Sequence, residues 1–380
     1  MNKRVLVGMS GGIDSSAVCM MLLEQGYEVI GATMRVHDLP SQFEEGEDEP
    51  THVKEAKSLA DKLGIEHYTI DLREEFKNNV IANFVDEYLA GHTPNPCVMC
   101  NLYFKWKFLL DTAKEHNCDF VATGHYAQIV DFDGVYTLKK GVDDKKDQSY
   151  FLWRLGQKEL SKTMFPLGGM NKEEIKKYVL SKGYEEKVKK KESMEVCFID
   201  GDYRDFLREQ MPEIDQKIGK GYFVDNTGKK IGEHKGFPFY TIGQRKGLGI
   251  ALGQPAFVVN INSKKNTIRI GFQDELLDDT LVLKDCNIVN EKLIDLMSQI
   301  EDIADNENER LYIKIRYRSK ELTVRKIERK ENILYIKFSE KASAITPGQS
   351  GVIYYKDMVV AGGIITDKRE IRKLKNTAAE

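Results

Sequence analysis

Cysteines are the residues best suited to chemistry in this 380-residue chain, and three of its six stand in suggestive positions. Cys97 and Cys100 form a C-x-x-C pair within GHTPNPCVMCN, and Cys197 lies far downstream in ESMEVCFIDGD. A C-x-x-C pair alone is typical of half a structural zinc site. A complete site needs four ligands, and the sequence has neither a second C-x-x-C pair nor a suitably spaced pair of histidines. We therefore favour reactive cysteines over structural zinc.

A second chemical feature is the stretch GMSGGIDS at residues 8–15, which directly follows the apolar run Val5–Val7. A strand, a Gly/Ser turn and a helix bring backbone N–H groups and a helix N-terminus to one point, which suits an anion. The lysine of the G-x-x-x-x-G-K-S/T nucleotide loop is missing, and the dinucleotide pattern G-x-G-x-x-G is not met either. The stretch predicts an anion site that follows neither the usual ATP-binding pattern nor the dinucleotide pattern.

The elements around this loop alternate between strands and helices. Apolar runs predict strands at 5–7, 27–36, 66–72 and 118–126, with helices at 15–25 and 53–63 between them. This alternation predicts an α/β fold with a doubly wound, mostly parallel sheet. Ligands of such sheets bind at the carboxyl ends of the strands, so we expect Ser10–Ser16, Met34 and Gly124–His125 to converge.

The pattern of apolar and turn-forming residues changes twice after these strands and helices. From about residue 205 short, glycine-rich segments predict a small β-rich domain, and after about residue 275 alternating strands separated by turns predict a β-barrel. LYIKIRYRS (311–319) is one of these expected strands, with its cations on alternating positions. We expect three domains, 1–204, 205–275 and 276–380, with a frayed tail from residue 368.

Composition sets broad limits on function. Hydrophobic residues at 41% and charged residues at 31% are normal for a globular protein, and no apolar stretch approaches the span of about 20 residues that crosses a membrane. Without a signal-peptide pattern, a cytoplasmic location is expected. A net charge of −3 means that a nucleic acid would need local basic patches, such as Lys139–Lys140, Lys145–Lys146 and Lys187–Lys191.

The SGGIDSS loop resembles the SGGxDS loop of the ATP-pyrophosphatase family, and nearly the whole chain is similar to the tRNA-specific 2-thiouridylases (the MnmA/TrmU family). The matching segments are GMSGGIDSS, TPNPCVMCN, ATGHYA, KKDQSYFL, EVCFI, TIGQRKGLGI, KIRYRS and TPGQSGVIYY. The resemblance implies an adenine nucleotide alpha hydrolase-like sheet domain. It also implies ATP-dependent adenylation at C2 of the wobble uridine (position 34) of tRNA, followed by sulfur transfer from a cysteine persulfide to give 2-thiouridine.

The resemblance also assigns roles to residues. Cys197 would carry the persulfide, and Cys100 would act on it and leave a Cys100–Cys197 disulfide. ATP would be bound with Mg²⁺, which Asp14 would help to place. The other nucleotide contacts implied are Gly8, Met9, Ser10, Gly11, Gly12, Ile13, Ser15, Met34 and Gly124. The contacts implied for the anticodon stem-loop of tRNA are Asn95, Pro96, Cys97, His125, Lys146, Asp147, Gln148, Arg316, Tyr317 and Gln349. The sulfur would come from a partner such as a cysteine desulfurase or a sulfur-relay protein.

One departure from the family pattern leaves the sulfur chemistry open. The commoner pattern is D-x-x-C, and Cys97 stands in the aspartate position. Cys97, Cys100 and Cys197 are then three thiols able to hold a 4Fe-4S cluster as an alternative to the persulfide. Either route needs thiolates, so we expect depressed pKa values for these cysteines. The remaining cysteines, Cys19, Cys118 and Cys286, are interpreted as core or surface thiols.

Three rival functions fit parts of the same sequence. An amidotransferase-like synthetase and a lysidine-type tRNA-modifying enzyme share the loop but have no need for paired reactive cysteines. A non-catalytic RNA-binding module with a structural metal belongs to a different class. ATP-dependent pyrophosphate release on addition of tRNA distinguishes this last alternative from an enzyme.

Overall fold

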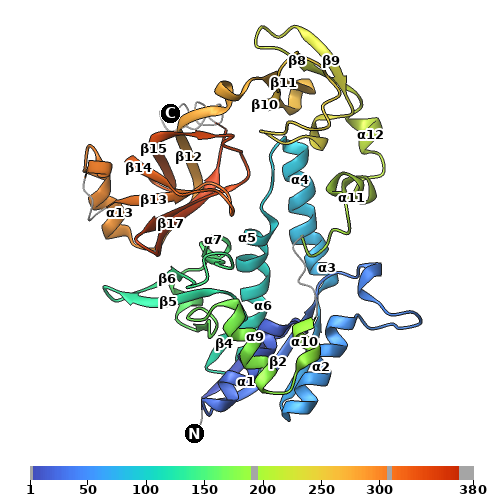
Figure 1. Ribbon diagram of the computed structural model, residues 1–380, viewed down its shortest axis with the longest axis vertical. Helices are drawn as coiled ribbons and strands as arrows, with labels where there is room; N and C mark the ends of the chain where they lie inside the picture. The colour runs from blue at the N-terminus through green and yellow to red at the C-terminus, as the bar shows by residue number, and fades with distance from the viewer. Residues whose placement is uncertain (1–2, 190–195, 306–309, 368–380) are drawn as a thin grey trace. The chain divides into compact units, whose positions relative to one another are not determined.

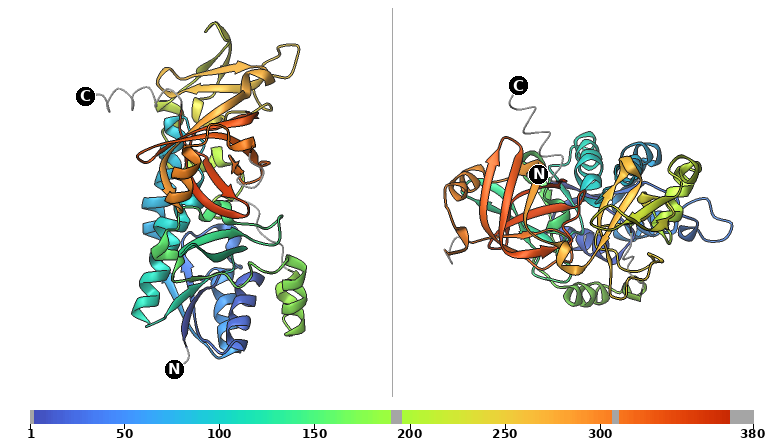
Figure 2. Two further views of the ribbon diagram at one scale, coloured as in Figure 1. Left: turned by 90° about the vertical axis from the view of Figure 1, so that its left-hand side faces the viewer. Right: turned by 90° about the horizontal axis from the view of Figure 1, so that it is seen from above.

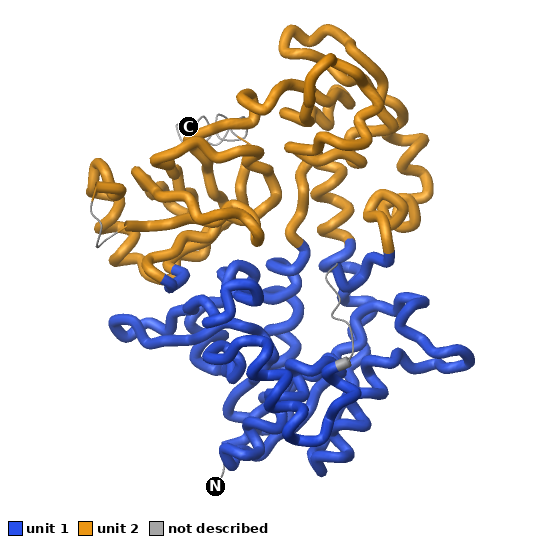
Figure 3. Tube along the Cα trace, in the orientation of Figure 1, with its two compact units in different colours: residues 1–81, 96–200, 357–359 blue, residues 82–95, 201–356, 360–380 orange. Residues whose placement is uncertain are grey.

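A computed structural model of the chain describes residues 3–189, 196–305 and 310–367 (Figure 1). Lys190 and Lys191 of the basic run, and the tail from residue 368, lie outside the described residues. The chain folds into two compact units (Figure 3). Unit 1 comprises Met1–Ile81, Pro96–Asp200 and Asp357–Val359, and unit 2 comprises Ala82–Asn95, Gly201–Lys356 and Val360–Glu380.

Unit 1 is built on a five-stranded parallel sheet with the order β3-β2-β1-β4-β7. Its strands are β1 (Arg4–Gly8), β2 (Glu28–Arg35), β3 (Glu66–Asp71), β4 (Phe120–Ala122) and β7 (Thr163–Met164). In register, Leu6 of the central strand β1 pairs with Ile30 on one side and Val121 on the other. The predicted doubly wound parallel sheet is confirmed.

Helices cover both faces of this sheet because its central strands are apolar on both sides. Val5 and Val7 of β1 pack into a core with α1 (Ile13–Glu24), α2 (Thr51–Leu63) and α9 (Lys172–Ser181). Leu6 points to the opposite face, where it packs against Leu109 and Ala113 of α6 (Lys107–Glu115). The strand period of two thus assigns neighbouring residues of β1 to different cores.

Short elements complete unit 1. They are η1 (Pro40–Gln42), α3 (Arg73–Phe76), η2 (Lys77–Ile81), α5 (Pro96–Cys100), η3 (Asn101–Trp106), β5 (Ala127–Phe132), β6 (Val135–Lys140), α7 (Ser149–Leu152), α8 (Gln157–Leu160) and α10 (Glu185–Lys189). Of these, α5, the π-helical η3 and α6 follow one another without a break along residues 96–115. π-helical turns occur often at functional sites.

Unit 2 contains a small four-stranded sheet with the order β10-β11-β8-β9. The strands are β8 (Gly221–Val224), β9 (Lys230–His234), β10 (Phe257–Asn262) and β11 (Thr267–Gly271), and the helical elements nearby in sequence are α11 (Tyr203–Gln210), α12 (Ile214–Lys217), η4 (Phe237–Phe239), η5 (Ser263–Lys265) and η6 (Gln273–Leu276). The helix α4 (Ala82–Ala90) also belongs to this unit, and its Tyr88 stacks on Tyr203 with ring centroids 4.7 Å apart.

Six antiparallel strands of unit 2 close into a barrel in the order β12-β15-β14-β13-β16-β17, because β12 also pairs with β17. These strands form the orange and red part of the ribbon in Figure 2. They are β12 (Leu277–Ile288), β13 (Leu311–Lys314), β14 (Leu322–Lys330), β15 (Ile333–Ser343), β16 (Ser350–Tyr355) and β17 (Met358–Ile365), with α13 (Glu291–Ser298) and η7 (Ile303–Asp305) in the β12–β13 connection. The predicted C-terminal β-barrel is confirmed.

Two expected strands are shorter than predicted. β4 covers only Phe120–Ala122 of the strand expected at 118–126. The strand expected at 311–319 is also cut short. β13 ends at Lys314, and residues 315–319 form a turn instead of continuing LYIKIRYRS as a strand. Ser319 causes the break, because its Oγ accepts hydrogen bonds from the N–H groups of Ile315 and Arg316, both at 3.3 Å. The cations of this segment therefore do not alternate along a strand.

No helix among the described residues 3–189, 196–305 and 310–367 is long and apolar enough to span a membrane.

Candidate functional site: a phosphate loop and a three-cysteine cluster

The Gly/Ser loop connects β1 to α1 at the carboxyl edge of the parallel sheet. Gly11 has a φ of +71°, and a Cβ there would stand 2.5 Å from the backbone oxygen of His52. Both the left-handed backbone and this close approach require glycine. Gly12 is the extended N-cap of α1. The first N–H groups of α1 are thus directed into the loop, as an anion site requires.

Serine hydroxyl groups fix the shape of the loop. Ser15 Oγ accepts from the Ser10 N–H at 3.1 Å and donates to the Gly12 carbonyl at 3.2 Å. Ser16 Oγ donates to the same carbonyl at 2.9 Å. Ser15 and Ser16 are buried, whereas Ser10 is exposed. The loop is therefore held in its curved form by its own side chains.

Asp14 is engaged by two side chains that sequence reasoning missed. Lys172 Nζ donates to both carboxylate oxygens, at 2.7 and 2.9 Å, and Tyr126 Oη donates to Oδ1 at 2.7 Å. Lys172 is 158 residues away in the sequence, and its side chain is buried. The available signal was the N-K-E-E stretch, in which the N-cap Asn171 and Glu174 start α9 and leave Lys172 in its first turn.

A second lysine also reaches the loop from downstream. Lys187 of α10 donates from Nζ to the Gly11 carbonyl at 2.7 Å and lies 3.4 Å from a carboxylate oxygen of Glu55. Its side chain is buried, so this member of the basic run is not part of a solvated face. The loop lacks a lysine of its own, and Lys172 and Lys187 bring two ammonium groups to it.

The remaining residues expected at the nucleotide lie near the same strand ends. A Cβ on Gly124 would stand 2.9 Å from Cβ of Asp14, so Gly124 packs directly on the loop. Met9 continues from Gly8 and donates its N–H to the Ala32 carbonyl at 2.8 Å, and Ile13 is buried at the start of α1. Met34 lies near the end of β2 and packs on the core that includes Leu109. The structure thus brings Gly124 to the loop.

The three cysteines lie in unit 1 around one lysine. Cys97 and Cys100 are in α5, and Cys197 is the second residue of the described range 196–305. Cys97 and Cys197 are exposed and Cys100 is buried, and all three are free thiols. Burial raises the pKa of each of the three thiols, and the positive charge of Lys105 in η3 partly opposes this rise. Burial lowers the pKa of Lys105 itself, but the three cysteines together raise it above its usual value.

The expected depression of the cysteine pKa values is wrong for this state of the protein. Burial raises the pKa of Cys100 to about 12, and the charge of Lys105 only partly opposes this. Desolvation by the surrounding protein also raises the pKa of Cys97 and Cys197, although both keep contact with solvent. A sequence shows which cations are available, but not how much water the fold removes from a thiol.

This raised pKa has a measurable consequence. The thiolate is the reactive form, so alkylation of Cys100 by iodoacetamide should accelerate about tenfold per pH unit between pH 7 and pH 9. The pKa of about 12 lies above this whole range, so the rate rises throughout. Lys105→Met should slow alkylation at every pH, because it removes the cation that lowers the thiol pKa. Peptide mass spectrometry measures the alkylation rate. A rate that reaches a plateau below pH 9 would contradict the raised pKa of Cys100.

The described residues give no geometric support to the cluster alternative. Within residues 3–189, 196–305 and 310–367, no group of three or more His, Cys, Asp or Glu side chains is arranged to hold a metal ion. The requirements of magnesium are different, because Mg²⁺ usually binds through one or two carboxylates, the phosphates of its nucleotide and water. Asp14, beside the loop, is a carboxylate of that kind.

Several residues expected to contact tRNA have structural partners in unit 1. His125 donates or accepts at Nδ1 with Thr123 Oγ1 at 2.7 Å, and burial lowers its pKa to about 3, so it is neutral near pH 7. The buried carboxylate of Asp147 accepts from the N–H groups of Gly141 and Ser149, both at 3.1 Å. Gln148 and Tyr126 exchange hydrogen bonds at 3.0 and 2.9 Å. Lys146, in the same loop, is half-buried.

Other residues expected to contact tRNA lie in unit 2 or at its boundary along the chain with unit 1. Gln349 Nε2 donates to the carbonyls of Thr93 and Pro94, both at 3.0 Å, and so fixes the segment that leads to Asn95. Pro96 is buried at the start of α5. Arg316 is exposed and donates from Nη2 to the Ser343 carbonyl at 3.1 Å. Arg316 and Tyr317 occupy the turn after β13, not the strand that was expected over 311–319.

A parallel sheet with a Gly/Ser phosphate loop after its first strand defines a nucleotide-binding domain of the HUP class, and family matches agree. Residues 3–201 match the tRNA methyl transferase HUP domain, residues 204–272 the tRNA methyl transferase PRC-barrel domain, and residues 279–365 the aminomethyltransferase beta-barrel domain.

Relatives then specify the family. The chain is 50% identical over 374 residues to tRNA-specific 2-thiouridylase MnmA 3 of Phocaeicola vulgatus, with 98% of this chain and 97% of that protein covered. It is also 50% identical to the protein of the same name from Bacteroides fragilis (97% and 96% covered), and 43% identical to tRNA-specific 2-thiouridylase MnmA of Cytophaga hutchinsonii (95% and 97% covered). The chain belongs to the tRNA-specific 2-thiouridylase family.

Proposed function

We propose that this protein uses ATP to adenylate C2 of the wobble uridine (position 34) of tRNA and then replaces the oxygen with sulfur to give 2-thiouridine. The observation that carries the proposal is that one unit holds both halves of the chemistry. A phosphate loop lies at the end of β1, and three thiols interact electrostatically with one lysine, Lys105. The oxygen at C2 of uridine is a poor leaving group, so adenylation must precede attack by sulfur.

In this proposal the loop binds the pyrophosphate end of ATP and leaves the α-phosphate open to attack by the uridine oxygen. The residues of the loop from Gly8 to Ser15 contribute N–H groups and hydroxyl groups, and Met34 and Gly124 line the nucleotide. Lys172 forms an ion pair with Asp14, and Lys187 donates a hydrogen bond to the Gly11 carbonyl. We propose that both ammonium groups offset charge on the leaving pyrophosphate. Magnesium carried by ATP would lie beside Asp14 and offset the same charge.

The sulfur step uses two cysteines. Cys197 is exposed and accepts sulfur from a donor protein, such as a cysteine desulfurase or a sulfur-relay protein, to form a persulfide. The terminal sulfur attacks C2 of the adenylated uridine, and AMP leaves with the original oxygen. The Cys100 thiolate attacks Sγ of Cys197, breaks the sulfur–sulfur bond and forms a Cys100–Cys197 disulfide. An external thiol reductant supplies the two electrons that reopen it.

Exchange of Cys97 for Asp separates this route from the cluster alternative. We expect Cys97→Asp to keep thiolation within about threefold of the original protein, because the persulfide route needs only Cys100 and Cys197 as sulfur carriers. Both proteins should contain no iron after anaerobic reconstitution with a persulfide donor. Iron in the original protein, with loss of both iron and activity in the variant, would overturn the persulfide route.

The tRNA contacts are proposed in two groups. Asn95, Pro96 and Cys97 contact the target base after it leaves its stack, and His125, Lys146, Asp147, Gln148, Arg316, Tyr317 and Gln349 contact or position the anticodon stem-loop. The side chains of Asp147 and Gln148 already accept hydrogen bonds from backbone N–H groups of the protein. We therefore propose that these two residues position the loop after β6. We also propose that the chain works as three domains, 1–204, 205–275 and 276–380.

The proposed function is tested by the product. Purified protein, unmodified tRNA, ATP and a persulfide donor should yield 2-thiouridine by nucleoside mass spectrometry, with no product when ATP is omitted. A lysidine-type enzyme or an amidotransferase-like synthetase would release pyrophosphate without forming a carbon–sulfur bond. An RNA-binding module would release no pyrophosphate at all.

A further inference from the structure

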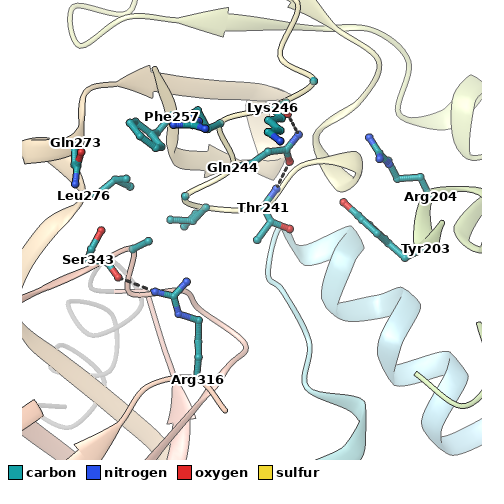
Figure 4. A pocket seen from close by; sticks show the side chains of 15 residues that line it. Tyr203, Arg204, Thr241, Gln244, Lys246, Phe257, Gln273, Leu276, Arg316 and Ser343 are labelled. Atoms are coloured by element: carbon teal, nitrogen blue, oxygen red, sulfur yellow. Dashed lines mark hydrogen bonds between the residues drawn. The ribbon is translucent and has the colours of Figure 1, made fainter. Parts of the chain in front are cut away.

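A cationic pocket lies within unit 2, outside the ATP loop and the cysteines of unit 1. Its volume is about 830 Å³, and residues of α11, the 241–247 turn, the start of β10 and the barrel line it (Figure 4). Four of its lining residues are cations, Arg204, Arg245, Lys246 and Arg316, and no Asp or Glu lines it among the described residues. This local charge contrasts with the net charge of −3 of the whole chain.

The turn that carries two of these cations has a fixed shape. Gln244 Oε1 accepts from the Thr241 N–H at 3.1 Å, and its Nε2 donates to the Lys246 carbonyl at 3.0 Å. The Gly243 N–H donates to the Val258 carbonyl at 2.8 Å. Gly243 has a φ of +86°, and a Cβ there would stand 2.9 Å from Cβ of Ala344. The turn therefore packs directly against the barrel segment on the other side of the pocket.

The four cations differ in how far other protein groups already engage their charges. Arg204 is ion-paired with Asp202, with a shortest separation of 2.6 Å, so much of its charge is already offset. Arg316 uses one Nη2 bond to the Ser343 carbonyl, which directs it along the pocket wall (Figure 4). Arg245 and Lys246 are exposed, and within the described part of the chain neither has an ion pair. Arg245 and Lys246 are therefore the most available for an anionic ligand.

Hydrogen bonds connect this pocket to the segment before the cysteines. Thr93 Oγ1 donates to Oγ1 of the lining residue Thr241 at 3.4 Å. The same segment is held by Gln349 through the Thr93 and Pro94 carbonyls. Thr93 precedes Asn95, the first residue proposed to contact the target base, by two positions. A ligand in the pocket would thus bind on a part of unit 2 that is hydrogen-bonded to the 93–94 segment.

We propose that this pocket is a tRNA-backbone site, in which Arg245 and Lys246 bind phosphates outside the target nucleotide. The proposal rests on the proposed function and extends it to residues of the PRC-barrel region. A concave pocket of this volume suits a few nucleotide groups, and the lining residue Phe257 offers an aromatic ring for stacking. The acidic surface of a sulfur-donor protein would need a much larger and flatter contact, of roughly 800 Å² on each partner.

The test compares two double variants of the full chain. Arg245→Gln/Lys246→Gln removes the two available charges, and Lys264→Gln/Lys265→Gln removes two exposed charges of the same β-rich region that do not line the pocket. Binding of unmodified tRNA is measured by fluorescence anisotropy across salt concentrations, and ATP binding is measured in parallel. We expect the pocket variant to bind tRNA about tenfold more weakly and to lose about 1.5 to 2 units of salt slope, with ATP binding unchanged. The control variant should change little.

Three outcomes would overturn the proposal: unchanged tRNA affinity and salt slope in the pocket variant, equal losses in both variants, or intact tRNA binding with slower sulfur loading of Cys197. The last outcome would assign the pocket to the sulfur donor. Failure of the proposed function has a different signature. In that case the original protein makes no 2-thiouridine, whereas the pocket variant still shows the weakened and less salt-dependent tRNA binding.

Discussion

Cys197→Ser should abolish formation of 2-thiouridine, with a loss of at least about 10³-fold, while ATP binding and pyrophosphate release stay within about twofold. A serine hydroxyl cannot carry a persulfide, so no sulfur nucleophile reaches the adenylated uridine. The phosphate loop, Asp14 and Lys172 are not altered by this change. Nucleoside mass spectrometry and a pyrophosphate assay, performed on the same reaction, measure 2-thiouridine formation and pyrophosphate release separately.

Cys118→Ser is the matched control for this experiment. Cys118 is, like Cys197, a free thiol of unit 1, but it is partly buried, and its Sγ donates a weak hydrogen bond to the His116 carbonyl at 3.8 Å. It lies just before the strand β4 and has no proposed role in sulfur transfer, so its replacement should leave product formation intact. Equal losses in Cys118→Ser and Cys197→Ser would indicate a general effect of thiol removal and contradict the role assigned to Cys197.

Lys172→Met should reduce the rate of pyrophosphate release by about 10²-fold, because it removes a preorganised positive charge from the phosphate loop. The ammonium group bonds both oxygens of Asp14, and methionine fills a similar volume without the charge. Sulfur loading of Cys197 should not change. Single-turnover pyrophosphate release with saturating tRNA and ATP measures the effect.

The control for Lys172 lies on the same helix. Lys176 of α9 pairs with Glu173 at the surface, at 2.8 Å, and Lys176→Met should leave the rate within about twofold. Thermal unfolding of both variants separates a charge effect from a loss of structure. Pyrophosphate release at the original rate in a folded Lys172→Met protein would show that the lysine only balances Asp14 and does not act on the nucleotide.

The sequence allowed the sheet and the phosphate loop to be predicted because both depend on short, contiguous patterns. The strand–turn–helix of residues 4–24 is encoded by the apolar run Val5–Val7, by Gly11 in a left-handed turn and by Gly12 at the helix N-cap. The barrel was equally visible as alternating strands with turn residues between them. The domain boundaries and the roles of individual residues stay predictions.

Features that depend on the folded arrangement were not predictable in this way. Lys172 and Lys187 reach the loop from 158 and 176 residues away, and nothing local to GMSGGIDS indicates them. Burial of Cys100 raises its pKa, against the expectation that the thiolates needed for sulfur chemistry have depressed pKa values. The turn at Arg316 depends on one serine hydroxyl that competes with the β-ladder for backbone N–H groups.

The most direct test of the account follows the oxygen that leaves the uridine. tRNA labelled with ¹⁸O at O2 of the wobble uridine is thiolated in a single turnover with unlabelled ATP, and the nucleotide products are analysed by mass spectrometry. Adenylation at this oxygen predicts one ¹⁸O in each AMP, one unlabelled pyrophosphate, and one 2-thiouridine per AMP. Labelled orthophosphate together with ADP, or unlabelled AMP with the label released as water, would contradict the proposed chemistry of this site.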